Sequence, residues 1–543
     1  MARQVRAPGG AGVTAPAATA ERDSGDLRTL ARGGALNLLG GGAAATLAFV
    51  LVVVVTRNLG AGGAGVFFEA VAIFMILASV CELGASTSMV RTVSRDRALG
   101  WSHDVVQTLG FSMIPVLALS GAVATALFLG APRLAEALGH GRSGDAVAYV
   151  RAMAPLLPLA AGTSVLLAGT RGLGTMSPFV LLENVAKPLL RPVLIIAALA
   201  LGLGPTALAL GWALPIALVF PLALIAFVVL LRRLQHRPEA EPEPTTSLGT
   251  RARAFWAFAL PRGVATASQV SVLWLAVPLV GALSSARDAG IYAAVSRTVI
   301  LGTLAIEAVR LAIAPQLSGL LARKDYARAE QLYQSGTWWL MALSWPLYAA
   351  LGVFAPLLLQ IFGGQFVAGA DALLILSIAM LLNTGTGSVT VVLLMGGKSL
   401  WNLFNTLGAL AITVVLSIVL IPRFGVTGAA MAWATSMVFE NVAALVEIRL
   451  LFGLQPFGSG YPRVAFAGLA CFGGGGLAAR ALLGPTLPAL VVATVVATVA
   501  YAALLWRWRH ILQLPTLLEG IRSWRRARPQ AAAVAEPAPE ATG

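Results

Sequence analysis

The chain has 543 residues, of which 58% are hydrophobic and 11% charged, and its formal net charge is +15. A soluble protein has roughly 25% charged residues, so this composition excludes an ordinary soluble domain. The basic residues lie in short segments between apolar runs, which excludes a nucleic-acid-binding surface and is typical of loops between membrane helices. The four histidines and two cysteines are too few and too scattered to indicate a disulfide framework or a metal site.

Nearly uncharged apolar stretches of about 20 residues recur along the chain, and each is long enough to cross the ~30 Å hydrocarbon core of a bilayer. These runs are continuous rather than alternating, which predicts membrane helices and not a β-barrel. We therefore expect an all-α integral membrane protein with about 14 transmembrane helices. The expected spans are residues 33–55, 65–90, 105–130, 151–170, 179–201, 206–231, 255–282, 290–320, 337–360, 371–395, 400–421, 426–448, 464–483 and 487–506.

The segments between and beyond these spans are short or of low complexity. We expect two pseudo-symmetric six-helix lobes followed by two C-terminal helices, with no room for a folded soluble domain. The expected divisions are a disordered basic cytoplasmic N-terminus (1–32), an N-terminal lobe (33–231), a cytoplasmic linker (232–254), a C-terminal lobe (255–448), the last two spans (449–508) and a cytoplasmic low-complexity tail (509–543).

The lysines and arginines outside the spans divide unequally between the two sides of the membrane. If the chain starts inside, 26 of them fall on the cytoplasmic side and 7 on the outer side. Cytoplasmic loops carry the excess of basic residues, so this division predicts an even number of spans with both termini in the cytoplasm. We expect the protein to lie in the cytoplasmic (inner) cell membrane.

A weak internal repeat relates the two predicted lobes. Gly65-Val-Phe-Phe follows the first span much as Gly290-Ile-Tyr follows the seventh, 225 residues later. Gly204-Pro-Thr matches Gly425-Val-Thr at an offset of 221 residues. Six spans per repeat would give parallel halves, which typically meet around a central path with the substrate site near mid-membrane. The alternative is chance similarity among helices rich in glycine and alanine.

Several stretches resemble a known family of membrane transporters. In chain order they are Ala35-Leu-Asn37, Thr56-Arg57-Asn-Leu-Gly60, Gly65-Val-Phe67, Glu82-Leu-Gly84, Ile361-Phe-Gly-Gly-Gln-Phe366, Ala370-Asp371-Ala-Leu-Leu374 and Phe424-Gly425-Val-Thr-Gly428-Ala-Ala430. They resemble the polysaccharide-exporting flippases of the multidrug/oligosaccharidyl-lipid/polysaccharide (MOP) superfamily, above all the O-antigen (Wzx-like) type. The resemblance covers residues 30–510. It implies fourteen helices in two lobes around a cavity, and movement of an undecaprenyl-diphosphate-linked oligosaccharide to the outer leaflet.

Charged residues within the spans are the candidate functional residues, because a charge in mid-membrane is costly unless it faces a partner or water. The candidate substrate-binding residues are Arg262, Arg297, Arg310, Lys187, Arg191 and Asn37. Arginine suits a diphosphate because its planar fork binds two oxygens at once and stays charged. These cations predict a hydrated, net-positive cavity between the lobes.

The acidic residues within the spans allow two roles, coupling to protons or pairing with cations. The candidates are Glu183, Glu307, Glu69 and Glu82, and further along the chain Glu440 and Glu447. Lys187 has Glu183 one helical turn before it, and Arg310 has Glu307 at the same side of its helix. Such structural ion pairs are the alternative to substrate binding, and Arg262 can instead extend its charge to the membrane interface.

Asparagines in the spans also allow two roles. Asn37, Asn383, Asn402 and Asn405 either bind sugar hydroxyls or bond helix to helix. No nucleophile–base pair, Gly-rich phosphate loop or metal-ligand spacing occurs in the sequence, so we expect no enzyme activity, no cofactor and no metal.

The expected function is therefore a flippase that moves a lipid-linked O-antigen or exopolysaccharide repeat unit by alternating access. We expect its partners to be membrane lipids, the polyprenyl-diphosphate-linked oligosaccharide, a polysaccharide polymerase and glycosyltransferases, and no nucleic acid. Three alternatives stay open. Two are a peptidoglycan lipid-precursor flippase and a multidrug exporter of the same superfamily. The third, from a different class, is a membrane polysaccharide polymerase or ligase, which the short outer segments disfavour because the largest, 131–150, has 20 residues.

Overall fold

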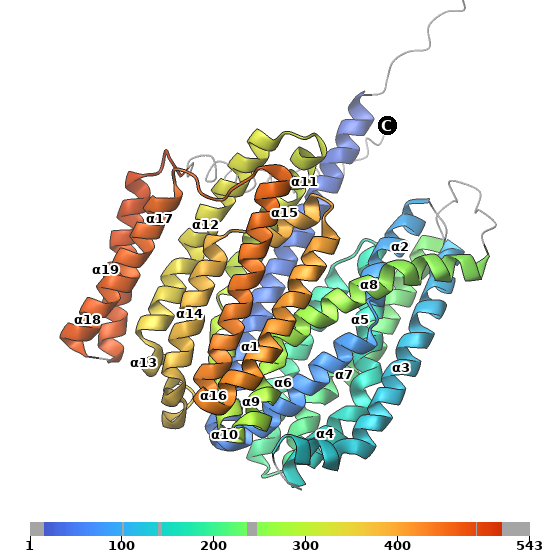
Figure 1. Cartoon of the computed structure of the whole chain (residues 1–543). Coiled ribbons are helices and arrows are strands. Elements are labelled where there is room, and N and C mark those ends of the chain that lie inside the picture. The colour runs from blue at the N-terminus through green and yellow to red at the C-terminus, as the bar shows by residue number, and fades with distance from the viewer. Residues whose placement is uncertain (1–15, 100–101, 140–143, 236–246, 485, 513–543) are drawn as a thin grey trace, which may run out of the picture.

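The structure is a computed structural model that describes residues 16–99, 102–139, 144–235, 247–484 and 486–512. Over these residues the chain is helical throughout and forms no strand. The longer helices run alongside one another in a single bundle (Figure 1). The expected all-α fold is confirmed.

The first half of the bundle is formed by the chain up to residue 235. Its elements are α1 (Pro16–Cys81), α2 (Ala85–Leu99), α3 (Ser102–Ala137), α4 (Gly144–Met153), η1 (Ala154–Leu156), α5 (Leu157–Gly172), η2 (Phe179–Ala186), α6 (Lys187–Ala200) and α7 (Pro205–Gln235). Helix α5 packs against α2, α3 and α7, and α6 packs against α7.

The second half begins after the linker. Its elements are α8 (Leu248–Trp274), α9 (Ala276–Leu283), α10 (Ala286–Ile300), α11 (Thr303–Ala322), α12 (Tyr326–Val353), α13 (Ala355–Leu359), η3 (Gly364–Gly369), α14 (Ala370–Gly385), α15 (Val389–Met395) and α16 (Ser399–Phe452). Helix α14 packs between α12 and α16. The remaining elements, α17 (Tyr461–Gly468), η4 (Leu469–Gly474), α18 (Gly475–Leu483) and α19 (Leu487–Arg507), form a hairpin at the edge of the bundle beside α12 (Figure 1).

Two of these helices each combine two expected spans. Helix α1 is bent at Gly60, where φ is 66°, and α16 is bent at Gly425, where φ is 52°. Both angles lie in the left-handed region, which glycine adopts without the steric cost that a Cβ would bring. A single glycine therefore reverses the chain at each of these positions.

Several expected spans are interrupted within the bundle, and two of these breaks, both in the second half, lie near a candidate cation. The span expected at 255–282 bends by 48° between α8 and α9. The span expected at 290–320 breaks between α10 and α11 at Gly302, where a Cβ would lie 2.4 Å from the ring of Tyr348. The Tyr348 hydroxyl donates to the carbonyl of Val299 at 3.3 Å, so it satisfies a backbone group near the break.

The two halves meet through a reciprocal contact between the glycines of the predicted repeat. A Cβ on Gly65 in α1 would lie 1.7 Å from the carbonyl oxygen of Ala286, and a Cβ on Gly290 in α10 would lie 2.0 Å from that of Ala61. Each glycine thus lets the other helix approach closely. A pair of helices related by two-fold symmetry makes this kind of self-complementary contact.

Helix α8 crosses from one half to the other. Figure 1 shows it running diagonally from beside α2 down to α9. Near its start, Trp256 donates through Nε1 to the carbonyl of Phe111 in α3 at 3.3 Å, and Ser88 in α2 donates to the carbonyl of Phe255 at 3.4 Å. The first turns of α8 are therefore bonded to the first half, whereas α9 packs against α10 and α16.

The apolar helices make this a multi-pass membrane protein. Within the described residues, eight helices are long and apolar enough to cross a membrane, or nine if the bent pair α8–α9 is one span. Two of the eight, α1 and α16, are the helices bent at a glycine. The count of fourteen spans and the division into two six-helix lobes plus two helices stay predictions.

The expected polar ends lie partly outside the described residues. Of the segment expected to be disordered, residues 16–32 belong to α1, whose alanines and arginines favour helix, while residues 1–15 lie outside. The central part of the expected linker, 236–246, and nearly all of the expected tail, 513–543, also lie outside the described residues.

Candidate functional site

The junction between α1 and α2 carries the first candidate acid. Glu82 is followed by Leu83 with φ of 52° and Gly84 with φ of 74°, so the chain turns here through two left-handed residues. The Ser86 hydroxyl donates to Glu82 Oε2 at 2.7 Å. Glu82 is half-buried and lies close enough to Glu183 and Lys187 for their charges to act on it.

A π-helix presents the next two candidates. The Lys187 backbone N–H donates to the carbonyl of Leu182, five residues back, which is the wide turn of η2. Such π-turns are rare and are frequently found at functional sites. The Lys187 ammonium donates to Glu183 Oε1, and the two side chains are 15% and 30% exposed. The pair is therefore enclosed but still reachable from outside.

Arg191 lies one turn beyond Lys187 on α6. Its Nε donates to the carbonyl of Trp212 in α7 at 3.0 Å, and its guanidinium carbon lies 3.9 Å from the centre of the Trp212 indole. Stacking on an aromatic face stabilises a cation without neutralising it. The structure thus holds Arg191 in one orientation with its charge intact.

A third cation of this group, Arg171, is absent from the sequence-based candidates because its position at the end of an expected span suggested a loop. Its guanidinium lies 4.5 Å from the ring centre of Phe179. Its Nε is buried, and within the described residues it has no hydrogen-bond partner. The charges of Glu82 and Glu183 act on it. The position of Arg171 in the sequence does not indicate that its side chain lies close to Glu82 and Glu183 in the fold.

These five residues form one group, which we call the N-half charge cluster: Glu82, Arg171, Glu183, Lys187 and Arg191. It brings together three cations and two carboxylates from the α1–α2 junction, α5, η2 and α6. With every member ionised the cluster carries a charge of about +1, a residual that a bound anion would neutralise. Four of the five were candidates from the sequence.

In the second half, Arg297 lies at the end of α10. Its guanidinium carbon is 3.5 Å from the centre of the Trp274 indole, at the bend between α8 and α9. In the described part of the chain, no carboxylate pairs with Arg297. The break between α8 and α9 and the break between α10 and α11 therefore lie close together, and Arg297 stacks on Trp274 there.

Arg310 has a different environment. It pairs with Glu307 at 3.2 Å, and the two side chains are 54% and 49% exposed. Arg310 also lines a cavity of about 280 Å³ together with Gln269, Asn383 and Glu440. This cavity contains both charged and amide groups, so it can accept a polar ligand.

The asparagines beside this cavity bond helix to helix. Asn441 donates through Nδ2 to Asn383 Oδ1 at 2.8 Å, and the Thr386 hydroxyl donates to Asn441 Oδ1 at 2.8 Å. Asn405 donates to Glu447 Oε2 at 2.7 Å. These bonds tie α14 and the two arms of α16 together, which is the structural role that polar residues play between membrane helices.

The remaining candidates have other surroundings. Glu69 is 1% exposed and packs against Gly281 in α9. Arg262 is half-buried on α8 beside Gly263, which closely approaches the α1–α2 junction. Asn37 is half-buried on α1, one turn before Gly40, where α1 packs against η2. The structure therefore does not bring all the candidate cations into one cluster.

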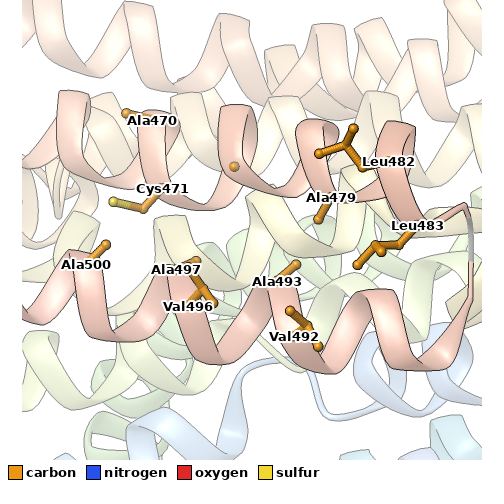
Figure 2. Close-up of a pocket in the computed structure, with 11 residues that line it drawn as sticks. Ala470, Cys471, Ala479, Leu482, Leu483, Val492, Ala493, Val496, Ala497 and Ala500 are labelled. Carbon is orange, nitrogen blue, oxygen red and sulfur yellow. The ribbon is translucent and has the colours of Figure 1, made fainter.

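A further cavity of about 520 Å³ lies between α18 and α19. Figure 2 shows leucine and alanine side chains of one helix facing valines and alanines of the other. Its lining contains only alanine, glycine, valine, leucine and one cysteine. This cavity can hold hydrocarbon but offers no charged group to a diphosphate.

The bundle has the architecture of solved membrane transporters. The lipid II flippase MurJ in an inward closed conformation matches with a TM-score of 0.68 and 11% identity, over 86% of this chain and 98% of that chain. An inward-facing multidrug resistance transporter of the MATE family, of the MOP superfamily, matches with a TM-score of 0.60 and 14% identity, over 76% and 94% of the two chains. The MATE multidrug transporter DinF-BH in complex with R6G matches with a TM-score of 0.59 and 19% identity, over 79% and 97%. The fold is therefore that of the MOP superfamily of membrane transporters.

The first half of the chain and the start of the second half identify the family. Residues 30–321, more than half of the chain, match the family described as polysaccharide biosynthesis proteins. The chain belongs to this family. No curated protein matches its sequence. The resemblance to polysaccharide-exporting members of the MOP superfamily is confirmed at the level of family and fold.

Proposed function

We propose that the protein is a flippase that moves an undecaprenyl-diphosphate-linked oligosaccharide, the repeat unit of an O-antigen or exopolysaccharide, across the membrane. The observation that carries the proposal is the N-half charge cluster in a chain of the polysaccharide biosynthesis family. The cluster contains more cations (three) than carboxylates (two). The buried Nε–H of Arg171 has no hydrogen-bond partner within the described residues. Guanidinium and ammonium groups in this arrangement suit a diphosphate.

The transport mechanism we propose is alternating access. The head group would bind to the cations while the prenyl chain stays in the bilayer. Rocking of one half against the other would then expose the head group at the opposite side. The close glycine contact between α1 and α10 supports this, because such contacts can separate without breaking side-chain hydrogen bonds.

We further propose that the protein lies in the cytoplasmic membrane with both termini in the cytoplasm. The support is the unequal division of lysines and arginines between the loops. In this orientation Gly60 and Gly425 lie at the outer side. A polysaccharide polymerase and glycosyltransferases are the partners that the substrate implies, because they would consume and supply it.

Two alternative substrates belong to the same fold. The MurJ likeness favours lipid II as the second candidate, because that protein is described as a lipid II flippase. A multidrug exporter is less favoured, because cationic drugs would be repelled by a cluster whose charge is positive. The polymerase or ligase alternative is less favoured because the outer segments expected from the sequence are short.

The test is a flipping assay with purified full-length protein in proteoliposomes. Each vesicle contains a lipid-linked oligosaccharide with a fluorescent group on the sugar, and a membrane-impermeant reductant destroys the fluorescence in the outer leaflet. We expect the protein to make the inner-leaflet pool accessible to the reductant. Arg171→Gln and Lys187→Gln should each slow this about tenfold or more, because a charged hydrogen bond contributes about 1.5–3 kcal/mol.

A parallel assay uses labelled lipid II in the same vesicles. Faster flipping of lipid II than of the oligosaccharide would overturn the proposed substrate in favour of the peptidoglycan precursor. Flipping of neither lipid, with full stability of the protein in detergent, would overturn the flippase proposal itself.

A further inference from the structure

Glu183 occupies the centre of the N-half charge cluster. It pairs directly with Lys187. Its charge also acts on Arg171 and on Arg191, whereas that of Glu82 acts on Arg171 and Lys187. Glu82 accepts a hydrogen bond from the Ser86 hydroxyl at 2.7 Å, and no salt bridge within the described residues joins it directly to a cation. The carboxylate of Glu183 therefore holds the position at which an anion would meet most of the positive charge.

The backbone around Glu183 forms a π-helix, which affects where its carboxylate can lie. Glu183 lies inside the π-helix η2, whereas Lys187 begins the α-helical stretch of α6. One residue of an α-helix corresponds to a rotation of about 100°, so closing the wide turn by one residue would rotate Glu183 by that amount relative to Lys187. The side chain is also 30% exposed, so packing does not enclose it completely.

From these observations we infer that Glu183 is a built-in counter-anion that fills the diphosphate position of the empty protein and is displaced by the substrate. This inference rests on the proposed function and assigns a role within the same site. A carrier of an anion must also return without it, and without Glu183 the cluster would then hold three enclosed cations against the single carboxylate of Glu82. A diphosphate brings more charge and more acceptor oxygens than one carboxylate, so it can replace Glu183.

The direct test measures binding of inorganic pyrophosphate to the detergent-solubilised full chain by calorimetry, with no transport step. Glu183→Gln removes the competing charge but keeps the shape of the side chain. We expect this variant to bind pyrophosphate about tenfold more tightly than the wild type, and to flip the lipid substrate several times more slowly because release is slower. Lys187→Gln should weaken pyrophosphate binding about tenfold in the same assay.

Two further variants make the result interpretable. Glu330→Gln, on α12 in the other half, removes one carboxylate from the protein without touching the cluster and should bind pyrophosphate like the wild type. Glu183→Asp keeps the charge on a shorter side chain, and it serves if Glu183→Gln does not fold. We expect Glu183→Asp to bind pyrophosphate more tightly than the wild type, by less than Glu183→Gln would.

The outcomes separate the inference from the proposed function. Equal or weaker pyrophosphate binding by the folded Glu183 variants would overturn the counter-anion role, whatever the flipping assay gives. Tighter binding by these variants, together with no flipping of the oligosaccharide lipid by the wild type, would uphold the counter-anion and overturn the proposed substrate.

Discussion

Arg297 and Arg310 lie on the two sides of the break between α10 and α11, yet their side chains have different partners. Arg310 already pairs with Glu307 in a half-exposed position, where an ion pair contributes ~1 kcal/mol or less. Arg297 instead stacks on Trp274, and within the described residues it has no carboxylate partner. Its charge therefore remains available to an anion, so we rank it above Arg310 as a substrate-binding residue.

Substitution of Arg297 tests this ranking. Arg297→Ala should lower the flipping rate about tenfold or more, because a lost charged hydrogen bond costs about 1.5–3 kcal/mol. Arg297→Lys keeps the charge but loses the planar stack on Trp274 and should give an intermediate rate. Arg310→Ala is the matched comparison and should lose less than threefold. Equal losses for the two alanine variants in the proteoliposome assay would contradict the ranking.

Among the helices, α1 and α10 make the closest backbone approach between the two halves. The contact depends on hydrogen atoms standing where Cβ atoms would otherwise be, at Gly65 and Gly290. Helices in lipid gain little from apolar burial against each other, so close packing of small residues is the main source of their association. The close contact of the two halves here therefore depends on the absence of a Cβ atom at Gly65 and at Gly290.

Adding those atoms should separate the helices. Gly65→Ala and Gly290→Ala should each lower the stability of the protein by about 1–3 kcal/mol, the cost of overpacking a close contact. Gly62→Ala is the matched control, because nothing lies within 4 Å of the added Cβ there and alanine favours the helix. Thermal unfolding in detergent measures the difference. A Gly65→Ala protein as stable as Gly62→Ala would show that the contact is not needed.

For the whole molecule, the two halves are also fastened where α1 bends at Gly60. Arg57 donates through Nε to the carbonyl of Ile361 at 2.7 Å and through Nη2 to that of Gln360 at 3.3 Å. The backbone N–H of Ala61 donates to Gln365 Oε1 at 3.4 Å. These bonds join the first half to the segment after α13, and alternating access would require them to break.

Removing this fastening should favour opening at the Gly60 end. In a variant without Cys81 and Cys471, the substitution Ala61→Cys places a thiol at a position that is 1% exposed. Arg57→Ala should raise the labelling rate of this thiol by a membrane-impermeant maleimide several-fold, because two inter-half hydrogen bonds are lost. Arg423→Ala is the control, since Arg423 is exposed next to the bend in α16. Unchanged labelling in Arg57→Ala would contradict a gating role for these bonds.

The class of fold follows from the pattern of residues along the chain alone. Long apolar runs must form helices in lipid because the backbone has no water to bond with, and this holds whatever the packing. Four of the five members of the N-half charge cluster also stand out in sequence, since Lys187 and Arg191 share a helix face with Glu183 and all are charges inside apolar runs.

Which charges meet depends on how the helices pack against one another. Arg171 joins the cluster from the end of another helix, and Arg297 stacks on Trp274 only because two spans are interrupted at neighbouring places. Arg57 donates to two backbone carbonyls at sequence separations of 304 and 303, a pairing that no local pattern predicts. The pattern of apolar residues predicts how long each helix is and which of its faces is hydrophobic. It does not encode which helix lies next to which, because in lipid that choice depends on close packing and on pairing of distant polar groups.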